Sequence, residues 1–260
     1  MKKKIYNPGI IIQARMESKR LPGKMMLKLA GKPLIYHIIQ RVKKCKKVKL
    51  IVLAIPNNKK NRCLSMIAKK MKIKIYFGSS SNLVNRIFKA AKKFKIDPII
   101  RIPGDNVIPE PREIDKIVLH HKKQIKPSFC SNLIPFLNSH YPDGIGAEVF
   151  DFESIKKLNY MKLNKKKREH LHLNFINYKK GLAVNSSFSS ISTIKCPKKF
   201  ARPDLVFDIN FEWQYLIFKK MYSQLYFKKK FFNINDSIKW VDKNVFKKKY
   251  LINEKNYYFN

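Results

Sequence analysis

The chain has 260 residues, 45% of them apolar and 12% aromatic, which is the composition of a globular protein and excludes a disordered one. No apolar run approaches the length of a membrane-spanning helix, and the run at residues 9–12 after the basic start is too short for a signal peptide. We therefore expect a cytoplasmic protein without membrane insertion, built as one large α/β domain or two small ones.

The charge balance is strongly basic, because 57 Lys and Arg against 17 Asp and Glu give a formal net charge of +40. A charge of this size usually indicates a nucleic-acid partner. Here the excess is mostly Lys spread along the whole chain, whereas proteins that read phosphates and bases favour Arg gathered on one face. We attribute the excess to AT-rich codon usage at solvated positions and expect no specific nucleic-acid partner. The 4 Cys form no CxxC pair, so neither a zinc site nor a disulfide framework is supported.

The first half of the chain alternates short apolar runs with amphipathic segments, the pattern of a parallel sheet covered by helices. We expect strands at residues 9–13, 49–54, 73–77 and 99–102, and helices at residues 33–45, 61–71 and 82–94. This order predicts an α/β fold with a Rossmann-like doubly wound sheet. Ligands on such sheets bind outside the carboxyl ends of the strands, where residues 13–24, 77–82 and 104–105 fall.

Beyond about residue 125 the pattern loosens. We expect strands at residues 129–133 and 147–150, helices at 152–160 and 168–178, one or two strands within 182–194, and the last helices at 211–221 and 236–248. No Gly/Ser linker and no internal repeat separates the two halves. One domain with an inserted lobe is therefore favoured over two autonomous domains.

The most informative segment is the loop after the first expected strand, Gln13-Ala-Arg-Met-Glu-Ser-Lys-Arg-Leu-Pro-Gly-Lys24. Backbone N–H groups freed by the Pro-Gly turn can point at phosphate oxygens, while Arg15, Arg20 and Lys24 supply charge as solvated loop cations. The spacing fits neither the P-loop nor the GxGxxG dinucleotide pattern. The loop predicts a polyanion site, and an ordinary basic strand-to-helix turn is the alternative.

This loop, with Ala30-Gly-Lys-Pro-Leu34 after it, resembles the signature loop of sugar-nucleotide cytidylyltransferases, in particular the SpsF-like group related to the CMP-sialate and CMP-Kdo synthetases. The resemblance implies a sheet of the nucleotide-diphospho-sugar transferase type with a small inserted lobe. It implies a nucleotide-binding half at residues 1–125 and a sugar-binding and oligomerisation half at residues 126–260. It also implies CTP and an acidic sugar as substrates, Mg²⁺ as cofactor and a possible homodimer. The nucleotide-binding residues that it implies in this loop are Gln13, Ala14, Arg15, Ser18, Arg20 and Lys24.

Arg101-Ile-Pro-Gly-Asp105 closes the last strand expected in the first half and resembles the R-x-T-G-D segment of the same family, whose Asp is a metal ligand. An Asp just past a strand end, after a Gly that permits close approach, is placed to hold Mg²⁺ against a nucleotide phosphate. Pro103 stands where the family has a hydroxyl residue. The resemblance assigns Asp105 to the metal and Arg101 to the nucleotide, and an Asp that closes a surface turn is the alternative.

A second metal ligand is expected in Arg202-Pro-Asp-Leu-Val-Phe-Asp208, which resembles the late R-x-T-V-D segment of the family. The apolar run at residues 205–207 indicates a buried strand that delivers Asp208 to its end. The alternative is that Asp208 caps the helix expected at residues 211–221.

Two further segments, Tyr141-Pro-Asp-Gly-Ile-Gly-Ala-Glu-Val-Phe150 and Arg168-Glu-His170, resemble landmarks of the SpsF-like group and are assigned to the sugar pocket. In this assignment Arg168 binds a substrate carboxylate through its guanidinium fork. A Pro-Asp-Gly turn and a solvated helix start are the alternatives for the two segments. The sugar-binding residues are then Asp143, Glu148, Arg168, Glu169 and His170.

Phe77-Gly-Ser-Ser-Ser-Asn-Leu-Val-Asn-Arg86 resembles the family's G-x-x-x-D-V-L-x-R element, with Asn82 in place of the Asp. Asn82 keeps the capacity to cap the following helix. Arg86 lies one turn into that helix, where it can reach the nucleotide or pair internally.

The expected reaction is attack of an acidic-sugar hydroxyl on the α-phosphate of CTP, with pyrophosphate as leaving group and no covalent enzyme intermediate. Lys24, Arg15 and Asp105 are the expected catalytic residues, and Asp105 and Asp208 the expected metal ligands. A nucleotidyltransferase of the same fold that uses another NTP or a sugar phosphate is an alternative. Two others are a basic nucleic-acid-binding protein and a lapsed homologue that acts as a partner subunit, the latter suggested by the departures at Asn82 and Pro103.

Overall fold

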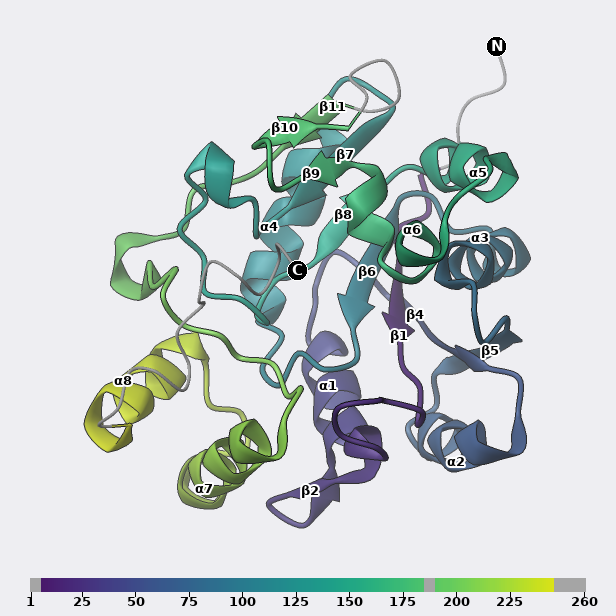
Figure 1. Ribbon diagram of the computed structural model, residues 1–260. Coiled ribbons are helices and arrows are strands. Elements are labelled where there is room, and N and C mark those ends of the chain that lie inside the picture. Colours follow the sequence, from purple (N-terminus) through teal and green to yellow (C-terminus); the bar gives the residue numbers. More distant parts are fainter. Residues whose placement is uncertain (1–5, 185–189, 246–260) are drawn as a thin grey trace.

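A mixed seven-stranded sheet forms the centre of the protein, as seen in a computed structural model that describes residues 6–184 and 190–245 (Figure 1). The strand order is β11-β7-β8-β6-β1-β4-β5, and every neighbouring pair is parallel except those that β8 makes with β6 and β7. The strands of this sheet are β1 (Gly9–Gln13), β4 (Leu50–Pro56), β5 (Lys74–Gly78), β6 (Ile99–Pro103), β7 (Ser128–Ser131), β8 (Glu148–Phe150) and β11 (Ser190–Ser192). Two short hairpins stand outside it: β2 (Lys28–Leu29) pairs with β3 (Lys32–Pro33), and β9 (Ile176–Asn177) pairs with β10 (Leu182–Ala183).

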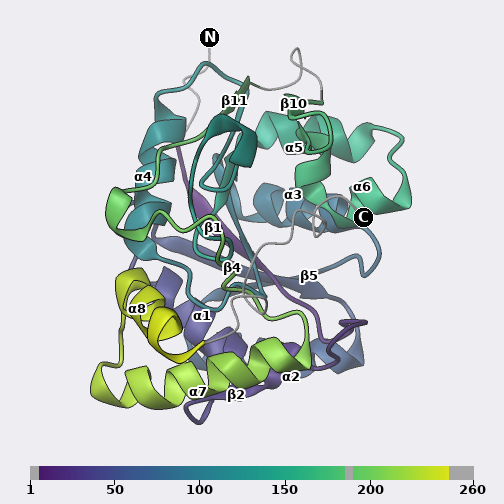
Figure 2. The same cartoon turned by 60° about the vertical axis from the view of Figure 1, so that its left-hand side comes forward.

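Helices cover both faces of the sheet, as Figure 2 shows from a second direction. The sheet separates two hydrophobic cores, one on each face. Ile10 and Ile12 of β1 pack into the first core, and Ile11 packs into the second. The first core is closed by α1 (Leu34–Val42), α2 (Arg62–Lys70), α4 (Pro111–Lys122), α7 (Glu212–Lys228) and α8 (Ile234–Asn244). The second is closed by α3 (Leu83–Phe94) and α5 (Phe152–Tyr160), and α6 (Lys165–Glu169) contacts α3. The expected α/β, doubly wound mixed sheet is confirmed.

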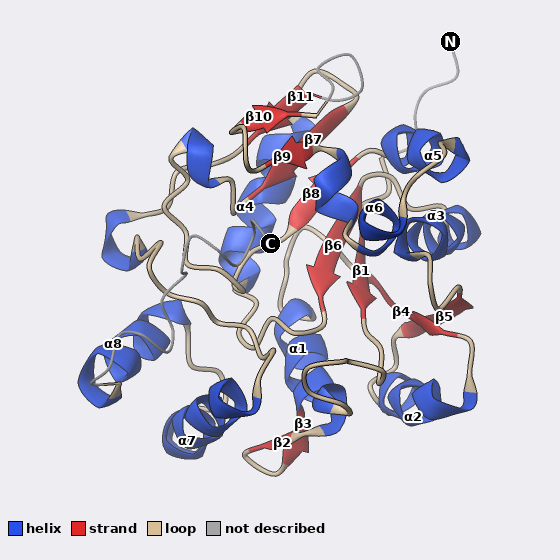
Figure 3. Ribbon diagram, viewed as in Figure 1, coloured by secondary structure: helices blue, strands red, loops and turns tan. Residues whose placement is uncertain are grey.

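The elements expected in the first half of the chain are present within two or three residues of their expected bounds. Local signals explain this agreement. Pro33 precedes the first turn of α1, and the side chain of Asn82 accepts a hydrogen bond from Asn85 N at 3.0 Å, which caps α3. Because β1 and β6 are parallel neighbours, the loops that follow them emerge at the same edge of the sheet (Figure 3).

The helix expected at residues 168–178 is wrong. Asn164 accepts a hydrogen bond from Lys167 N at 2.9 Å, so the capped helix α6 begins at Lys165. His170 has φ −113° and ψ 87°, which ends the helix, and a short 3₁₀ turn at Leu171–Asn174 leads into β9. Periodicity alone did not reveal this break, because apolar side chains continue on both sides of it.

The run at residues 205–207 is buried but is not a strand of the sheet. It makes isolated bridges instead, with Val206 opposite Asp143 and Asp208 opposite Asn106. Helix α8 begins at Ile234, ahead of its expected start, because Asn233 caps it. Residues 185–189 of the strand region expected at 182–194, and residues 246–248 of the expected last helix, lie outside the described residues.

Both halves of the chain contribute strands to the same sheet, since β7, β8 and β11 follow residue 125. The division into a nucleotide-binding and a sugar-binding half stays a prediction. All four cysteines are free thiols. In the part of the chain that the structure describes, no helix has both the length and the apolar character needed to cross a bilayer.

Candidate active site

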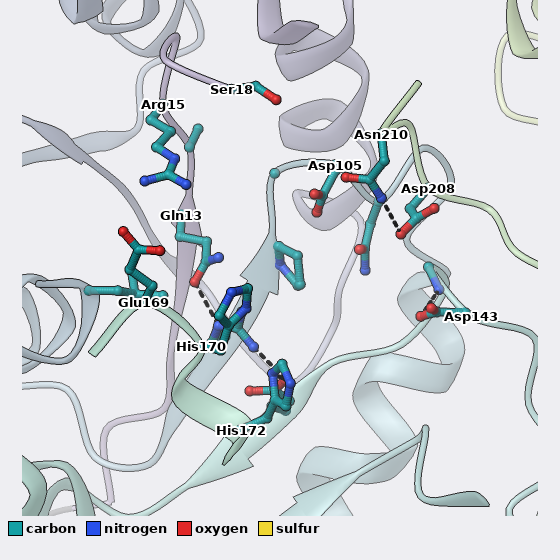
Figure 4. Close-up of a pocket in the computed structure, with 18 of the residues that line it drawn as sticks. Gln13, Arg15, Ser18, Asp105, Asp143, Glu169, His170, His172, Asp208 and Asn210 are labelled. Carbon is teal, nitrogen blue, oxygen red and sulfur yellow. Dashed lines mark hydrogen bonds and ion pairs between the residues drawn. The ribbon is translucent and has the colours of Figure 1, made fainter. Parts of the chain in front are cut away.

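A cleft of about 670 Å³ opens at the carboxyl ends of β1 and β6, where the sheet rule places ligands (Figure 4). It brings together segments from the first 24 residues, from 80–106, from 131–178 and from 208–210. The expected site residues that line it are Gln13, Ala14, Arg15, Ser18, Arg20, Lys24, Arg86, Arg101, Asp105, Asp143, Glu148, Glu169, His170 and Asp208. Arg168 is the one expected site residue that does not.

The loop after β1 is fixed by a polar network beneath it. Gly23, with φ +71°, closes the loop by donating from its N–H to Met16 O at 3.0 Å. Met16 N in turn donates to the side-chain oxygen of Asn61 at 2.9 Å. The carboxylate of Glu17 accepts hydrogen bonds from the side-chain amides of Asn58 and Asn61. The loop therefore presents its basic side chains from a defined backbone.

Lys24 is buried, and this corrects the expectation of a solvated loop cation. Its ammonium group donates to Asp105 Oδ2 at 2.9 Å, to Ile209 O at 2.8 Å and to Asn210 Oδ1 at 3.0 Å. An ammonium group has three donors, so all of its hydrogen-bonding capacity is used. Lys24 thereby joins the loop after β1 to the loop after β6 and to the segment that precedes α7.

Asp105 and Asp208 are held together by the backbone. Ile209 N donates to Asp105 O at 3.0 Å, and Asp208 forms a bridge with Asn106. Gly104 lets the loop after β6 approach the end of β1, because a Cβ there would lie 2.5 Å from Gln13 O. These contacts bring two carboxylates that are distant in sequence to one point of the cleft (Figure 4).

The two carboxylates differ in their electrostatic state. Burial raises the pKa of Asp105, but the charge and hydrogen bond of Lys24 outweigh it and the pKa is lowered. The pKa of Asp208 is raised well above its usual value, first by burial and then by the charges of Asp143 and Asp105. A cation placed between these carboxylates would relieve that repulsion.

The donor set fits a Mg²⁺ ion that takes its remaining ligands from phosphate oxygens and water. The relevant observation is Asp208 Oδ1, which is buried and has no hydrogen-bond partner, while Oδ2 accepts from Asn210 at 2.9 Å. Among residues 6–184 and 190–245, no group of three or more His, Cys, Asp or Glu is arranged to hold a metal by itself. The pair could therefore bind such an ion only together with a substrate.

Residues 205–209 also form backbone hydrogen bonds with Asp143. Asp143 N donates to Leu205 O, and Phe207 N donates to Asp143 O, both at 2.9 Å. The helix-cap alternative for Asp208 is wrong, because the cap of α7 is Phe211. The segment is thus a clamp that holds the turn at Asp143 beside Asp105 and Asp208.

The floor of the cleft is a buried polar group centred on Arg101. Its Nε donates to Gln13 Oε1 at 2.7 Å, and its Nη1 forms an ion pair with Glu148 Oε1. The carboxylate of Glu148 is thus partly buried, and Arg101 is its charged partner. Glu148 Oε2 is buried with no hydrogen-bond partner, so it is an acceptor available to a ligand hydroxyl.

Arg86 lines the wall of the cleft near Arg15. Its Nη1 donates to Ser79 O at 2.6 Å, which fixes the loop before α3, and its Nε has no partner. Burial, helped by the charge of Arg15, lowers the pKa of Arg86 to about 10. Two neighbouring guanidinium groups with an unused donor favour an anionic ligand at this wall.

Arg168 lies outside the cleft lining, which differs from its expected role. Its Nε donates to Leu163 O at 2.8 Å, so the side chain is turned back onto the segment before α6.

His172 follows the end of α6 and lines the cleft. Burial lowers the pKa of His172 to about 3, so it is a neutral imidazole near Glu148.

His172 and Asn210 are two polar residues of the cleft that sequence reasoning missed. For His172 no usable signal was present, because the helix expected at residues 168–178 would have placed it on a different side from His170. For Asn210 no signal was present, because its contacts are with residues far away in the chain.

Most of the residues that line the cleft lie within residues 9–181, which match the sequence profile of a family described as Cytidylyltransferase. The chain is 30% identical over 161 residues to an uncharacterized protein of Methanocaldococcus jannaschii, covering 62% of this chain and 63% of that protein. It is 26% identical over 219 residues to the spore coat polysaccharide biosynthesis protein SpsF of Bacillus subtilis, covering 82% and 85%. It is 30% identical over 112 residues to the 3-deoxy-manno-octulosonate cytidylyltransferase of Anaeromyxobacter sp. (strain K), and this match spans 42% of the chain and only 45% of that protein.

Solved structures share the fold over most of the chain. A cytidylyltransferase from Leptospira borgpetersenii superposes with a TM-score of 0.78 at 26% identity, covering 93% of this chain and 96% of that one. A CMP:2-keto-3-deoxy-manno-octonic acid synthetase complexed with CTP superposes with a TM-score of 0.60 at 14% identity, covering 84% and 99%. At that identity the second likeness shows the fold alone.

Proposed function

The chain belongs to the cytidylyltransferase family, a family of nucleotidyltransferases, and on this premise we propose that it transfers CMP from CTP to an acidic sugar in a Mg²⁺-dependent reaction. The product would be a CMP-sugar for surface polysaccharide synthesis. The observation that carries the proposal is the cluster of Lys24, Asp105 and Asp208 at one side of the cleft. A buried cation and two carboxylates, one with an unused oxygen, suit a metal–triphosphate substrate.

The residues of the loop after β1 would bind the nucleotide. Arg15 and Arg20 would pair with phosphate oxygens, and Lys24 would hold the end of the loop against Asp105 while facing the triphosphate. Gln13, Ala14, Ser18, Arg86 and Arg101 would complete the nucleotide side. Asp105 and Asp208 would hold Mg²⁺, which when bound supplies positive charge against the phosphate oxygens.

The chemical step needs alignment more than covalent help from the protein. A sugar hydroxyl oxygen releases its proton to solvent and forms a bond to the α-phosphorus, the bond from that phosphorus to the bridging oxygen breaks, and pyrophosphate leaves. Arg15 and Lys24 would stabilise the charge that develops on the phosphate oxygens. The buried floor would keep the acceptor in line with that bond.

The acceptor would lie over Glu148, with Asp143, Glu169 and His170 at its sides. Burial lowers the pKa of His170, the charge of Glu169 opposes this shift, and the charges of Arg101, Lys166 and Arg15 favour it. These three cations near His170 support an acidic sugar although Arg168 is turned away. The carboxylate would then meet cations from β6 and the loop after β1.

The test is pyrophosphate release by the purified chain with CTP and a panel of 2-keto-3-deoxy sugar acids, with Mg²⁺ and with EDTA. We expect release that requires CTP, an acidic sugar and the metal, and that Asp105→Asn abolishes. ATP, GTP and UTP with the same panel, and CTP with sugar phosphates, test the substrate class. No metal-dependent release with any combination, together with DNA binding that survives physiological salt, would overturn the proposal in favour of a nucleic-acid-binding protein.

A further inference from the structure

Asn210 contacts the loop after β1 and the carboxylate of Asp208 at the same time. It is 3% exposed. Its Oδ1 accepts from Arg20 Nη2 at 2.8 Å and from Lys24 Nζ at 3.0 Å, and its Nδ2 donates to Asp208 Oδ2 at 2.9 Å. Its own N–H donates to Gln214 Oε1 at 2.6 Å, which ties the residue to the first turn of α7.

These partners fix the orientation of the amide. Guanidinium and ammonium groups are donors only, and an ionised carboxylate is an acceptor only. Rotating the amide by half a turn would place its NH₂ against Arg20 and Lys24 and its oxygen against Asp208. The observed orientation is therefore the one in which every contact is a hydrogen bond.

The consequence for Asp208 is that its two oxygens are no longer equivalent. Oδ2 is held by Asn210, and Oδ1 is buried with no partner. Lys24 is affected as well, because one of its N–H donors is used by the neutral oxygen of Asn210 and not by the carboxylate of Asp208. Its ion pair is with Asp105. Without the amide, Lys24 could turn to Asp208 and compete with a metal for that carboxylate.

We propose that Asn210 is a positioning residue of the transfer reaction, which turns Asp208 so that Oδ1 faces the cation and keeps Lys24 paired with Asp105. The inference rests on the proposed function, since it needs a metal–nucleotide substrate. Residues that orient a metal ligand through a hydrogen bond commonly control metal affinity, and their loss costs about 10- to 100-fold.

The test compares the wild type with Asn210→Leu, which has a similar volume and no polar atoms, and with Asn210→Ala. Asn233→Ala, which removes the cap of α8 away from the cleft, is the matched control for lost stability. Mn²⁺ binding is titrated by electron paramagnetic resonance with CTP and no sugar, so that no turnover occurs. In parallel, kcat, KM for CTP and the Mg²⁺ dependence of turnover are measured.

We expect both Asn210 variants to weaken Mn²⁺ binding at least about 10-fold and to need correspondingly more Mg²⁺ for half-maximal turnover, with Asn233→Ala unchanged. At saturating Mg²⁺, kcat should fall while KM for CTP changes by less than about threefold, because the lost effect is on alignment. Unchanged Mn²⁺ affinity in a folded Asn210→Leu or Asn210→Ala protein would overturn the inference, and so would failure of both to fold. A wild type that binds no Mn²⁺ with CTP would overturn the proposed function itself.

Discussion

Lys24 Nζ and Asp105 Oδ2 lie 2.9 Å apart, and this ion pair joins the loops that follow two adjacent parallel strands, β1 and β6. The side chain of Lys24 is 10% exposed and that of Asp105 is 29% exposed. Because the pair lowers the pKa of Asp105 against the effect of burial, it keeps the carboxylate ionised, which is the form that a cation needs. The loop that we propose for phosphate binding thus also keeps the proposed metal ligand Asp105 ionised.

Lys24→Met should therefore affect stability as well as turnover. Loss of the ammonium leaves Asp105 without its main counter-charge, so we expect the free energy of unfolding to fall by about 1–3 kcal/mol. Turnover should fall about 100-fold, because a cation that faces the triphosphate is also lost. Urea unfolding and steady-state kinetics measure the two effects.

A double-mutant cycle with Asp105→Asn separates the ion pair from the other contacts of Lys24. We expect a coupling energy of unfolding of about 1–3 kcal/mol between the two positions. Additive losses would show that Lys24 is held by Ile209 O and Asn210 alone, and that the pair with Asp105 is incidental.

Asp105→Asn and Asp208→Asn should each lower turnover by at least about 100-fold, because either change leaves the triphosphate charge poorly neutralised when pyrophosphate departs. If both residues act through one ion, the double variant should be scarcely slower than the single variants. Asp242→Asn, at an exposed ion pair with Arg202, is the control and should keep full activity. Multiplicative losses would mean that the carboxylates act independently, and a near-normal Asp208→Asn enzyme would remove Asp208 from the metal site.

Much of the first half of the fold could be predicted because its signals are local. Apolar runs followed by glycine, proline or a capping residue define β1, β4, β5 and β6 and the helices between them. The same signals place Asp105 at a strand end and predict that it shares an edge of the sheet with the loop after β1. The nearness of Asp208 was predicted, although its apolar run proved to be a bridge segment and not a strand.

The remaining features depend on contacts between distant parts of the chain. Lys24 and Asn210 are 186 residues apart in sequence, and no pattern near either residue reports that they touch. Arg168 is an exception: it was expected in the cleft because its segment resembles a motif, yet its Nε donates to Leu163 O, only five residues away. Periodicity carries no information about the direction of either long side chain, Lys24 or Arg168.

Gly144→Ala tests the clamp formed by residues 205–209. Gly144 has φ +81°, and a Cβ there would lie 2.3 Å from Phe207 O, so the clamp would have to move. Gly31, with φ +78° and nothing within 4 Å of its ideal Cβ, is the matched control, because Ala there meets only the backbone strain. We expect Gly31→Ala to cost about 1 kcal/mol of unfolding free energy. Gly144→Ala should cost at least about 1–3 kcal/mol more, because backbone shifts are needed, and should also lower turnover.

Equal melting temperatures and equal activities for the two alanine variants would show that residues 205–209 can shift away from a Cβ at position 144 at little cost in free energy. In that event the spacing between Asp143 and Asp208 could not be set by the contact of Gly144 with Phe207.

His37 is a buried group outside the cleft whose titration should affect stability. It lies where α1 packs against α7, with its Nε2 2.7 Å from Leu29 O and its ring 4.6 Å from that of Tyr222. Burial lowers the pKa of His37 to about 4, although the contact with Leu29 O opposes the shift. In the unfolded chain the pKa of a histidine is about 6.5.

Between pH 6.5 and pH 4, His37 therefore binds a proton in the unfolded chain but not in the native state. The free energy of unfolding decreases as the pH falls through this window. The contribution of His37 is fully present above about pH 6.5 and decreases by up to about 3 kcal/mol at pH 4. In His37→Gln this loss is absent, so the difference in unfolding free energy between wild type and variant should shrink on acidification. Urea unfolding at several pH values from 7.5 to 4.5 measures it, with His140→Asn, at an exposed site, as the control. Parallel pH profiles for wild type and His37→Gln would show that the pKa of His37 is the same in the native and unfolded states and that another group causes any acid instability.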